Sequence, residues 1–312
     1  MKNKKNVLIT GANGFVGKSL YRYLRNLNYN VIGAVRNDIV SRYGQKVFSV
    51  GTIDSNTDWE KALQGIDTVV HLAARTHIMN ETLKNPLSEF LEVNCQGTIN
   101  LARQCISQGV SRFIFISSIG VNGFRTDEKV FSVDSKPMPH SPYAVSKFEA
   151  ENSLKELVNN SSMDLVIIRP PAIYGKNAPG NFGAIAKMIS KGIPLPLDGI
   201  DNKRSLIHLD NLTSFIEVCI NNDKAANRLF IVSDDEDLST TDTIELIGYV
   251  LNKSPKMFKM PKWAIRIALI FIGRKKSADS LLSNLQVDIR YAKHLLDWTP
   301  PFNPRNLINT KK

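Results

Sequence analysis

The residues best suited to chemistry lie in the segment Ser141–Lys147, SPYAVSK. Ser141 is a good N-cap residue and Pro142 a good first helical residue, so a helix is predicted to begin there. Tyr143 and Lys147 then lie four residues apart on one face of that helix. A tyrosine with an ordinary pKa of about 10 is a poor acid–base catalyst near neutral pH. A lysine ammonium nearby would stabilise the phenolate and lower this pKa, so we expect Tyr143 to act as an acid and base.

A hydroxyl group is expected to join this pair from the end of a strand. The strand Phe113–Ile116 is followed by Ser117 and Ser118. A side chain at the carboxyl end of a central strand in an open sheet points into the ligand cleft. The Y-x-x-x-K spacing alone is frequent by chance. Together with these serines, and with a glycine-rich turn earlier in the chain, it predicts a catalytic set of Ser118, Tyr143 and Lys147.

The glycine-rich turn Thr10–Gly17, TGANGFVG, follows the first predicted strand and precedes a helix expected to open near Phe15. Its spacing is G-x-x-G-x-x-G. Glycines at such a turn let the backbone approach a pyrophosphate, and the helix N-terminus offers N–H groups and a positive dipole end. We therefore predict a dinucleotide site formed by Gly11, Asn13, Gly14, Phe15, Val16 and Gly17.

The elements that position these groups alternate between strands and helices. Strands are predicted at Val7–Thr10, Val31–Val35, Val47–Val50, Thr68–Leu72, Arg112–Ser117, Leu165–Arg169 and Arg228–Val232. Helices are predicted at Lys18–Leu27, Asp58–Leu63, Phe90–Gln108 and Pro142–Val158. This alternation predicts an α/β fold with a Rossmann-type, doubly wound parallel sheet. We expect a dinucleotide-binding domain over residues 1–170 and a smaller, mainly substrate-binding domain over 171–312, with some segments returning to the first.

The end of the second predicted strand bears on the choice of cofactor. Enzymes that prefer NAD usually carry an acidic residue there for the adenosine ribose. Here Val31–Val35 ends without one, and Arg36 follows. A guanidinium suits a ribose 2′-phosphate, so NADP is slightly favoured over NAD. Stacking of Arg36 on the adenine of either cofactor is the alternative.

The composition is that of an ordinary globular protein, with 43% hydrophobic and 22% charged residues. Met1–Lys5 runs into the first predicted strand, so no N-terminal signal is expected. The apolar run Trp263–Gly273 is about half as long as a membrane-spanning helix. Cys95, Cys105 and Cys219 are isolated and lack metal-ligand spacing, which predicts reduced thiols in a cytoplasmic protein and no metal site.

The net charge of +11 is concentrated near the C-terminal end. Residues 253–312 hold thirteen Lys and Arg against three acidic residues. A basic wall for an anionic substrate, attachment to an anionic membrane surface, nucleic-acid binding and a plain solvated surface are the alternatives. No aromatic–basic interleaving or nucleic-acid module is present in the sequence, so we expect no nucleic-acid partner.

Taken in order, these motifs resemble those of the extended short-chain dehydrogenase/reductases, in the group of NDP-sugar epimerases and dehydratases. The resemblance covers essentially the whole chain and implies a nucleotide-sugar substrate. It rests on Thr10–Gly17, Val69–Ala74 (VVHLAA), Val93–Thr98 (VNCQGT), Phe115–Ser118, Tyr143–Lys147, Arg169-Pro170, Arg204–Asp210 (RSLIHLD) and Leu296–Pro300 (LDWTP).

The resemblance also implies roles for single residues. Ser118 and Tyr143 would bind the sugar oxygen that is oxidised or reduced. Arg204 would clamp the nucleotide diphosphate, Asn181 would contact the phosphosugar, and the loop Leu195–Leu197 would cover the base. Lys147 would hold the nicotinamide ribose, and Asn94 would support the helix behind the site. The other cofactor contacts would come from Thr52, Ile53, Leu72, Ala73, Ala74, Asn94, Tyr143 and Pro170.

One departure from the family pattern reduces the number of reactions expected of this chain. The 4,6-dehydratases carry an Asp-Glu pair directly after the hydroxyl residue, where this chain has Ile119-Gly120, so dehydration is not expected. The resemblance implies action at carbon 4 of a UDP-hexose or UDP-N-acetylhexosamine in surface polysaccharide precursor synthesis. Arg36 then favours a 4-ketoreductase among such enzymes. A UDP-glucose or UDP-GlcNAc 4-epimerase is the alternative, and a non-catalytic NADP-binding sensor is the third. His71 and His77 are interpreted as structural, because a tyrosine already fills the acid–base role.

A homodimer is implied by the same resemblance. In relatives, the helices that correspond to Phe90–Gln108 and Pro142–Val158 pair with their two-fold copies in a four-helix bundle. Their outer faces are predicted to offer an apolar seam of Ile99, Cys105, Phe148 and Leu154. Two copies of the basic C-terminal part on one particle would add to any weak, peripheral attraction to anionic lipid.

Overall fold

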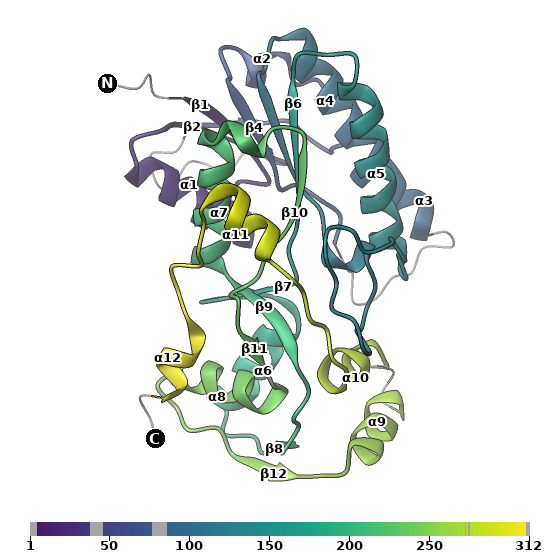
Figure 1. The fold of residues 1–312 in the computed structure, drawn as a ribbon, viewed down its shortest axis with the longest axis vertical. Helices are drawn as coiled ribbons and strands as arrows, with labels where there is room; N and C mark the ends of the chain where they lie inside the picture. Colours follow the sequence, from purple (N-terminus) through teal and green to yellow (C-terminus); the bar gives the residue numbers. More distant parts are fainter. Residues whose placement is uncertain (1–4, 38–45, 77–85, 272, 274, 310–312) are drawn as a thin grey trace.

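The computed structural model describes residues 5–37, 46–76, 86–271, 273 and 275–309. Its centre is a seven-stranded sheet with the order β10-β6-β5-β4-β1-β2-β3, parallel throughout (Figure 1). The Rossmann-type, doubly wound sheet is therefore confirmed, and each predicted strand is present in it. The strands are β1 (Asn6–Thr10), β2 (Asn30–Val35), β3 (Lys46–Ser49), β4 (Thr68–His71), β5 (Arg112–Ile116), β6 (Asp164–Arg169) and β10 (Arg228–Ile231).

Helices cover both faces of this sheet, as an all-parallel sheet requires. In β1, Val7 and Ile9 pack into one core cluster and Leu8 into the other, because successive strand side chains point to opposite faces. The first cluster includes residues of α1 (Phe15–Asn26) and α7 (Leu209–Asn221). The second includes residues of α2 (Glu60–Leu63), α4 (Gly97–Ser107) and α5 (Pro142–Val158).

The helix predicted over Phe90–Gln108 is divided into three segments. These are α3 (Pro86–Leu91), a π-helical turn (Glu92–Gln96) and α4. The apolar seam predicted on the outer faces of α4 and α5 is wrong in composition. Ile99, Cys105 and Leu154 are buried in the core that these helices form against the sheet, because an amphipathic helix turns its apolar stripe inward. Of the four residues, Phe148 is the one that is partly exposed.

The chain after β6 builds a second region below the sheet (Figure 1). Strands β7 (Ala172–Tyr174), β9 (Arg204–His208) and β11 (Asp237–Leu238) form a three-stranded sheet, and β8 (Leu195–Asp198) pairs with β12 (Met257–Lys259). The helices here are α6 (Gly180–Ser190), α8 (Thr240–Val250), α9 (Lys262–Phe271), α10 (Lys275–Leu282) and α12 (Pro304–Asn309). By contrast, α7, β10 and α11 (Arg290–Leu296) pack with the seven-stranded sheet. The domain division at residue 170 stays a prediction.

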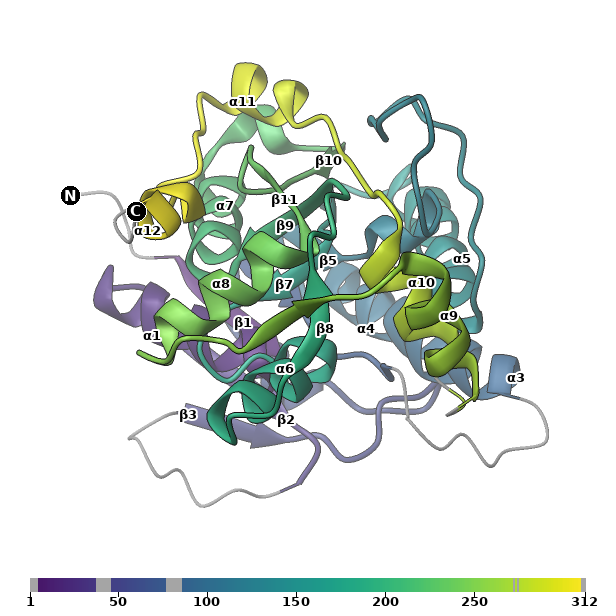
Figure 2. The same cartoon turned by 90° about the horizontal axis from the view of Figure 1, so that it is seen from below.

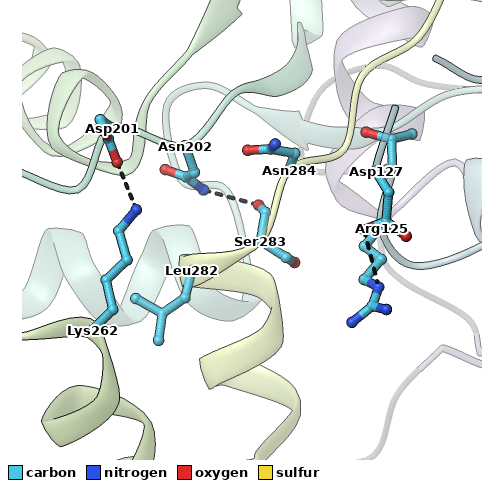
Figure 3. Close-up of a pocket in the computed structure, with 9 residues that line it drawn as sticks. Arg125, Asp127, Asp201, Asn202, Lys262, Leu282, Ser283 and Asn284 are labelled. Atoms are coloured by element: carbon cyan, nitrogen blue, oxygen red, sulfur yellow. Dashed lines mark hydrogen bonds and ion pairs between the residues drawn. The ribbon is translucent and has the colours of Figure 1, made fainter. Parts of the chain in front are cut away.

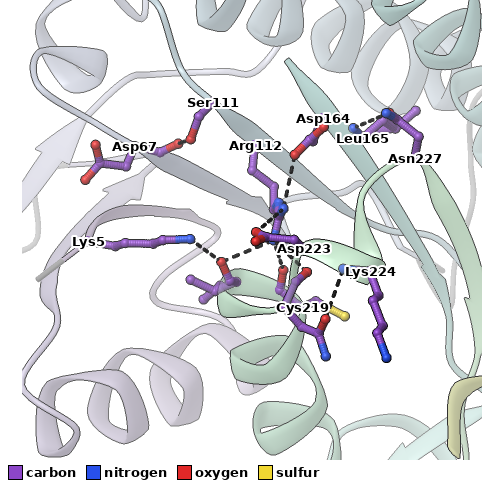
Figure 4. A network of polar contacts seen from close by, with 12 residues as sticks. Lys5, Asp67, Ser111, Arg112, Asp164, Leu165, Cys219, Asp223, Lys224 and Asn227 are labelled. Atoms are coloured by element: carbon purple, nitrogen blue, oxygen red, sulfur yellow. Dashed lines mark hydrogen bonds and ion pairs between the residues drawn. The ribbon is translucent and has the colours of Figure 1, made fainter. Parts of the chain in front are cut away.

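Arg112, at the amino end of β5, ties the sheet to the C-terminus of α7 (Figure 4). Its guanidinium donates to the carbonyl oxygens of Cys219 at 2.8 Å and Asn222 at 3.1 Å, and pairs with Asp164 at 3.0 Å. The last carbonyls of a helix lack backbone partners and carry the negative end of its dipole, so a buried cation satisfies both. This network secures the amino edge of the sheet and leaves the carboxyl edge for a binding site.

Three features considered in the sequence can be compared with the structure. Cys95, Cys105 and Cys219 are buried and form no disulfide. No helix within the described ranges is long and apolar enough to cross a membrane. Within the same ranges, no three His, Cys, Asp or Glu side chains gather in a way that could hold a metal ion.

Candidate active site

The glycine-rich turn joins β1 to α1 with a backbone path that side chains would block. Gly11 has a φ of +65°, and a Cβ on it would lie 3.0 Å from the Ala73 backbone. A Cβ on Gly17 would collide with the carbonyl oxygen of Gly11. Gly14 is the N-cap of α1, and no side chain caps this helix, so its first N–H groups face outward for an anion. The cradle fits a dinucleotide pyrophosphate, with Asn13, Phe15 and Val16 exposed or half-buried on the same turn.

A chain of hydrogen bonds beneath the turn connects β1, β4 and α4. The Ala73 N–H donates to Thr10 Oγ1 at 3.1 Å, and this hydroxyl lies 2.8 Å from His71 Nδ1. His71 Nε2 lies 2.9 Å from Thr98 Oγ1, which donates to the Asn94 carbonyl oxygen at 2.7 Å. Because Thr98 uses its proton on that carbonyl, Nε2 is the donor to Thr98, and Nδ1 of a neutral His71 then accepts from the Thr10 hydroxyl. Burial lowers the pKa of His71 to about 3, and its place in this chain is structural.

Protein stability is expected to fall as the pH drops below the ordinary histidine pKa of 6.5, because of His71. The unfolded state binds the extra proton between that value and the folded-state pKa of about 3. The contribution of His71 to the free energy of unfolding is therefore fully present above pH 6.5. It is lost as the pH falls from 6.5 toward 3, at up to about 1.4 kcal/mol per pH unit. Urea unfolding across the range should show a shallower pH dependence in His71→Gln than in the wild type. Equal slopes would contradict this assignment.

His77, the other histidine interpreted as structural, lies outside the described residues.

Asn94 lies in the π-helical turn and joins two parts of the site. Its Oδ1 accepts from the Arg75 N–H at 2.8 Å, and its Nδ2 donates to the Arg75 carbonyl and to Ser146 Oγ, each at 3.0 Å. Ser146 in turn donates to the Tyr143 carbonyl at 2.8 Å. The π-helical turn, a feature frequent at functional sites, thus holds the loop after β4 against the start of α5. This is support of the kind expected of Asn94, while its contact with a cofactor stays a prediction.

The two serines after β5 have different environments. Ser117 is buried and donates to Glu151 Oε1 at 2.5 Å. Ser118 is partly exposed at the carboxyl edge of the sheet, and its Oγ accepts from the Gly120 N–H at 3.1 Å. An Oγ that accepts here still has its own proton to donate to a ligand oxygen. Ser118 is therefore the serine suited to bind a substrate.

Lys147 is buried on α5 with its ammonium turned toward the end of β5. Its Nζ donates to the Ile116 carbonyl at 2.8 Å and lies 4.4 Å from the centre of the Phe115 ring. Burial lowers the pKa of Lys147 to about 7, and the Glu151 carboxylate opposes this shift. The Lys147 ammonium therefore loses its proton at a lower pH than an ordinary lysine does.

Tyr143 lies in the first turn of α5, in edge-to-face contact with Phe90 at 6.3 Å between ring centres. Burial raises the pKa of Tyr143 to about 12. The lowered pKa expected from Lys147 is therefore wrong for this arrangement, because desolvation penalises the phenolate and the ammonium is bound at the Ile116 carbonyl. The phenol is a proton donor here, and a further positive charge is needed before it becomes an effective base.

A buried ion pair beneath the site was not predicted from the sequence. Arg169 and Glu151 join through Nε and Oε1 at 2.9 Å and through Nη2 and Oε2 at 2.5 Å. Arg169 Nη1 also donates to Asn122 Oδ1 at 2.9 Å. The pair links the ends of β5 and β6 to α5, where the predicted catalytic residues lie. The sequence does indicate where Glu151 lies, because this residue follows Lys147 by four positions and so shares its helix face.

The other residues predicted to contact the cofactor border the carboxyl edge of the sheet. Neighbouring parallel strands end at the same edge, which brings these segments together. Arg36 follows β2 with an exposed side chain, and Pro170 follows β6 and is buried. Thr52 is exposed and Ile53 half-buried after β3, and Leu72, Ala73 and Ala74 follow β4 and are half-buried. Each individual contact stays a prediction.

On the substrate side, the structure brings Asn181 and Arg204 together in one pocket, which Phe182 and Leu206 also line. Arg204 Nη1 donates to the Ser283 carbonyl at 2.9 Å, and burial lowers the pKa of Arg204 to about 10. A guanidinium has five N–H donors, so Arg204 can also bind a diphosphate.

Leu195 does not join that pocket. The predicted loop Leu195–Leu197 is part of strand β8, and the Leu195 side chain is buried in a core cluster with Ile185 and Ile189. Pairing of β8 with β12 explains the difference, since the Leu195 N–H donates to the Lys256 carbonyl at 2.9 Å. The segment is therefore a strand and not a loop, and its Leu195 side chain belongs to the core, while a contact between this segment and the base stays a prediction.

A larger, polar cavity of about 420 Å³ lies beside this pocket, between α10 and the loop that carries Arg125 and Asp127 (Figure 3). Lys262 pairs with Asp201 at 2.6 Å on one side of it. Asn202 Nδ2 donates at 2.9 Å to the Ser283 carbonyl, the same oxygen that accepts from Arg204. The cavity and the Asn181–Arg204 pocket thus share a wall at the end of α10.

The fold and this site define an NAD(P)-dependent enzyme of the extended short-chain dehydrogenase/reductase class. The glycine turn, Ser118, Tyr143 and Lys147 all lie at or beside the carboxyl edge of one doubly wound sheet. The chain belongs to the NAD dependent epimerase/dehydratase family, whose model matches residues 7–232.

Two relatives and one solved structure have names that are more specific than that of the family. The UDP-glucose 4-epimerase of Vibrio cholerae is 42% identical over 303 residues, which are 96% of this chain and 92% of that protein. The N-acetyl-α-D-glucosaminyl-diphospho-ditrans,octacis-undecaprenol 4-epimerase of Escherichia coli O157:H7 is 29% identical over 82% of this chain and 75% of its own. The structure of UDP-glucuronic acid 4-epimerase from Bacillus cereus in complex with NAD shares the fold, with a TM-score of 0.75, 23% identity and coverage of 96% and 95%.

Proposed function

We propose that the protein is a UDP-sugar 4-epimerase, acting on UDP-glucose or UDP-GlcNAc. The observation that carries this proposal is the 42% identity to a UDP-glucose 4-epimerase over 96% of the chain. The more distant E. coli relative is also a 4-epimerase, although its sugar is carried on a polyprenyl diphosphate. We therefore prefer the epimerase to the 4-ketoreductase that Arg36 favoured.

In this reaction the chain's own residues bind the sugar and move one proton. Ser118 donates a hydrogen bond to the C4 oxygen, and Tyr143 takes the proton of the C4 hydroxyl during oxidation and returns it during reduction. A bound NAD(P), held by the glycine turn and Lys147, would supply the hydride acceptor and donor and a positive charge near the phenol. That charge opposes the burial that raises the pKa of Tyr143.

Epimerisation also requires that the site holds the diphosphate end of the substrate while the sugar end turns. Arg204 and Asn181 lie together in a pocket suited to the diphosphate. With that end bound, the 4-keto sugar can turn and present its opposite face before it is reduced. Because the product has the same oxidation level as the substrate, no cofactor is consumed.

Dehydration has no support at the positions after Ser118. Ile119 is buried, and a Cβ on Gly120 would lie 3.2 Å from Ser118 Oγ, so an acidic side chain at that position would crowd the hydroxyl. The sensor alternative is also disfavoured, because the chain keeps both Tyr143 and Lys147, one helical turn apart on α5.

Cofactor retention tests the proposal. The purified protein should release a stoichiometric amount of NAD⁺ on denaturation and should convert its UDP-sugar without added cofactor. A protein that releases no dinucleotide and acts only with added NADPH would overturn the epimerase and restore the 4-ketoreductase.

Arg36→Ala is expected to lower NADP(H) affinity by about 1–3 kcal/mol, because a charge-assisted contact to the 2′-phosphate is lost, while NAD(H) affinity changes little. Calorimetry on cofactor-stripped protein measures both affinities. Arg25→Ala, at an exposed arginine in the last turn of α1, is the matched control and should change neither. Equal losses for both cofactors would indicate adenine stacking instead.

Three broader statements stay predictions. A homodimer would use α4 and α5, which lie side by side on one flank of the molecule (Figure 1). The protein would be cytoplasmic. Its product would enter the synthesis of surface polysaccharide precursors.

A further inference from the structure

Helix α9 presents an apolar stripe to solvent. Trp263 is 68% exposed, Ile267 50%, Ile270 46% and Phe271 88%. These positions are separated by four, three and one residues, so they share one face of the helix. Scattered exposed apolar residues are ordinary, but four on a single ten-residue helix form a contiguous patch.

The opposite face of α9 already has a structural role. Ile265 is buried in a core cluster with Ile189 and Ile244, and Leu269 packs against the same cluster. The helix is therefore held in place by its inner face. Within the described part of the chain, the four residues of the outer stripe belong to none of the core clusters, so that core does not account for their apolar character.

Basic side chains lie on the segment through β12 that leads into α9. Residues 253–271 contain five Lys and Arg and no acidic residue. Lys253, Lys256 and Lys259 are exposed and form no ion pair within the described part of the chain. Lys262 and Arg266 pair with Asp201 at 2.6 Å and Asp279 at 3.4 Å. The surface is thus apolar along α9 and positively charged along the neighbouring β12 segment.

This surface lies at one extremity of the molecule. In Figure 1, α9 and β12 are at the lower end, far from the seven-stranded sheet, and Figure 2 shows α9 beside α10 at the edge of that end. Phe258 of β12 is 44% exposed between Lys256 and Lys259. A flat partner can therefore reach β12 and α9 together.

We propose that this surface, comprising Trp263, Ile267, Ile270 and Phe271 with the lysines at 253, 256 and 259, docks on an anionic phospholipid bilayer. Tryptophan and phenylalanine suit the boundary between headgroups and acyl chains, and lysines suit anionic headgroups. A ten-residue helix is too short to span a bilayer, so α9 would lie in the plane of the interface. A second copy of this chain fits less well, because a two-fold contact would bring like charges together.

Tryptophan fluorescence tests the proposal directly, because Trp263 is the exposed one of three tryptophans and Trp59 and Trp298 are buried. Vesicles of phosphatidylglycerol and phosphatidylcholine in equal parts should shift the emission of the full-length protein to the blue at low salt. Brominated lipid should quench it. Vesicles of phosphatidylcholine alone should do neither.

Variants then connect the signal to the surface. Trp263→Ser with Phe271→Ser should weaken vesicle flotation at least about tenfold, and Lys256→Glu with Lys259→Glu should abolish the preference for anionic lipid. Leu27→Ser, at an exposed leucine just after α1, is the matched control and should float as the wild type does. Epimerase turnover and circular dichroism of the α9 variant should be unchanged, which separates this proposal from the proposed function and from misfolding.

Two results would overturn the proposal. One is the absence of vesicle binding at low salt, or binding by the α9 double variant that equals that of the wild type. The other is a smaller mass by light scattering for that variant than for the wild type, which would make the stripe a contact between copies of this chain.

Discussion

Tyr143→Phe is expected to lower turnover of the UDP-sugar by at least about 100-fold while leaving nucleotide-sugar affinity nearly unchanged. The substitution keeps the ring and its edge contact with Phe90, and it removes the hydroxyl that is proposed to move the C4 proton. Turnover is measured by product formation and affinity by calorimetry, so that loss of chemistry is separated from loss of binding.

Tyr291→Phe provides the control, because Tyr291 lies on α11 and packs against Phe230, whose core cluster is on the face of the sheet opposite to α5. It should turn over at the wild-type rate. Near-normal turnover in Tyr143→Phe would remove the acid–base role from Tyr143. An equal loss of affinity and turnover would assign Tyr143 to binding instead.

Glu151→Ala is expected to destabilise the protein by about 3–5 kcal/mol, because it leaves the buried Arg169 guanidinium without its carboxylate. It should also shift the basic limb of the pH–rate profile to lower pH. The Glu151 carboxylate opposes the burial that lowers the pKa of Lys147, and this opposition is lost in the variant. Urea unfolding measures the first effect, and turnover as a function of pH measures the second.

Glu149→Ala is the matched control on the same helix, where an exposed carboxylate should contribute less than about 0.5 kcal/mol. Replacing both members of the buried pair, as Glu151→Met with Arg169→Met, should recover part of the lost stability, since no unpaired charge is left. If Glu151→Ala proved as mild as Glu149→Ala, the pair would not be holding β5, β6 and α5 together.

Much of the fold was predictable because its causes are local. The runs Val7–Ile9 and Phe113–Ile116 are wholly apolar, as is typical of strands buried on both faces, and the structure places both in the parallel sheet. Gly11 and Gly17 are required by backbone contacts within a few residues and with the Ala73 segment. Ser141 and Pro142 begin α5 at the predicted position.

The parts that were not predicted depend on partners distant in sequence. Leu195 was assigned to a loop because its pairing segment, around Met257, carries no signal of that pairing. The direction faced by Ile99 and Leu154 is set by the sheet, which turned both residues inward. The pKa of Tyr143 depends on burial and on where Lys147 points, and neither follows from a four-residue spacing.

The central claim is that the site inverts carbon 4 of a UDP-sugar without net oxidation or reduction. Proton NMR of the purified protein with UDP-glucose, and separately with UDP-GlcNAc, both without added cofactor, tests this most directly. The account predicts that signals of the C4 epimer appear and that the mixture reaches the same composition from either epimer. No conversion of either sugar, together with NADPH-dependent reduction of a 4-keto-6-deoxy UDP-sugar, would contradict it.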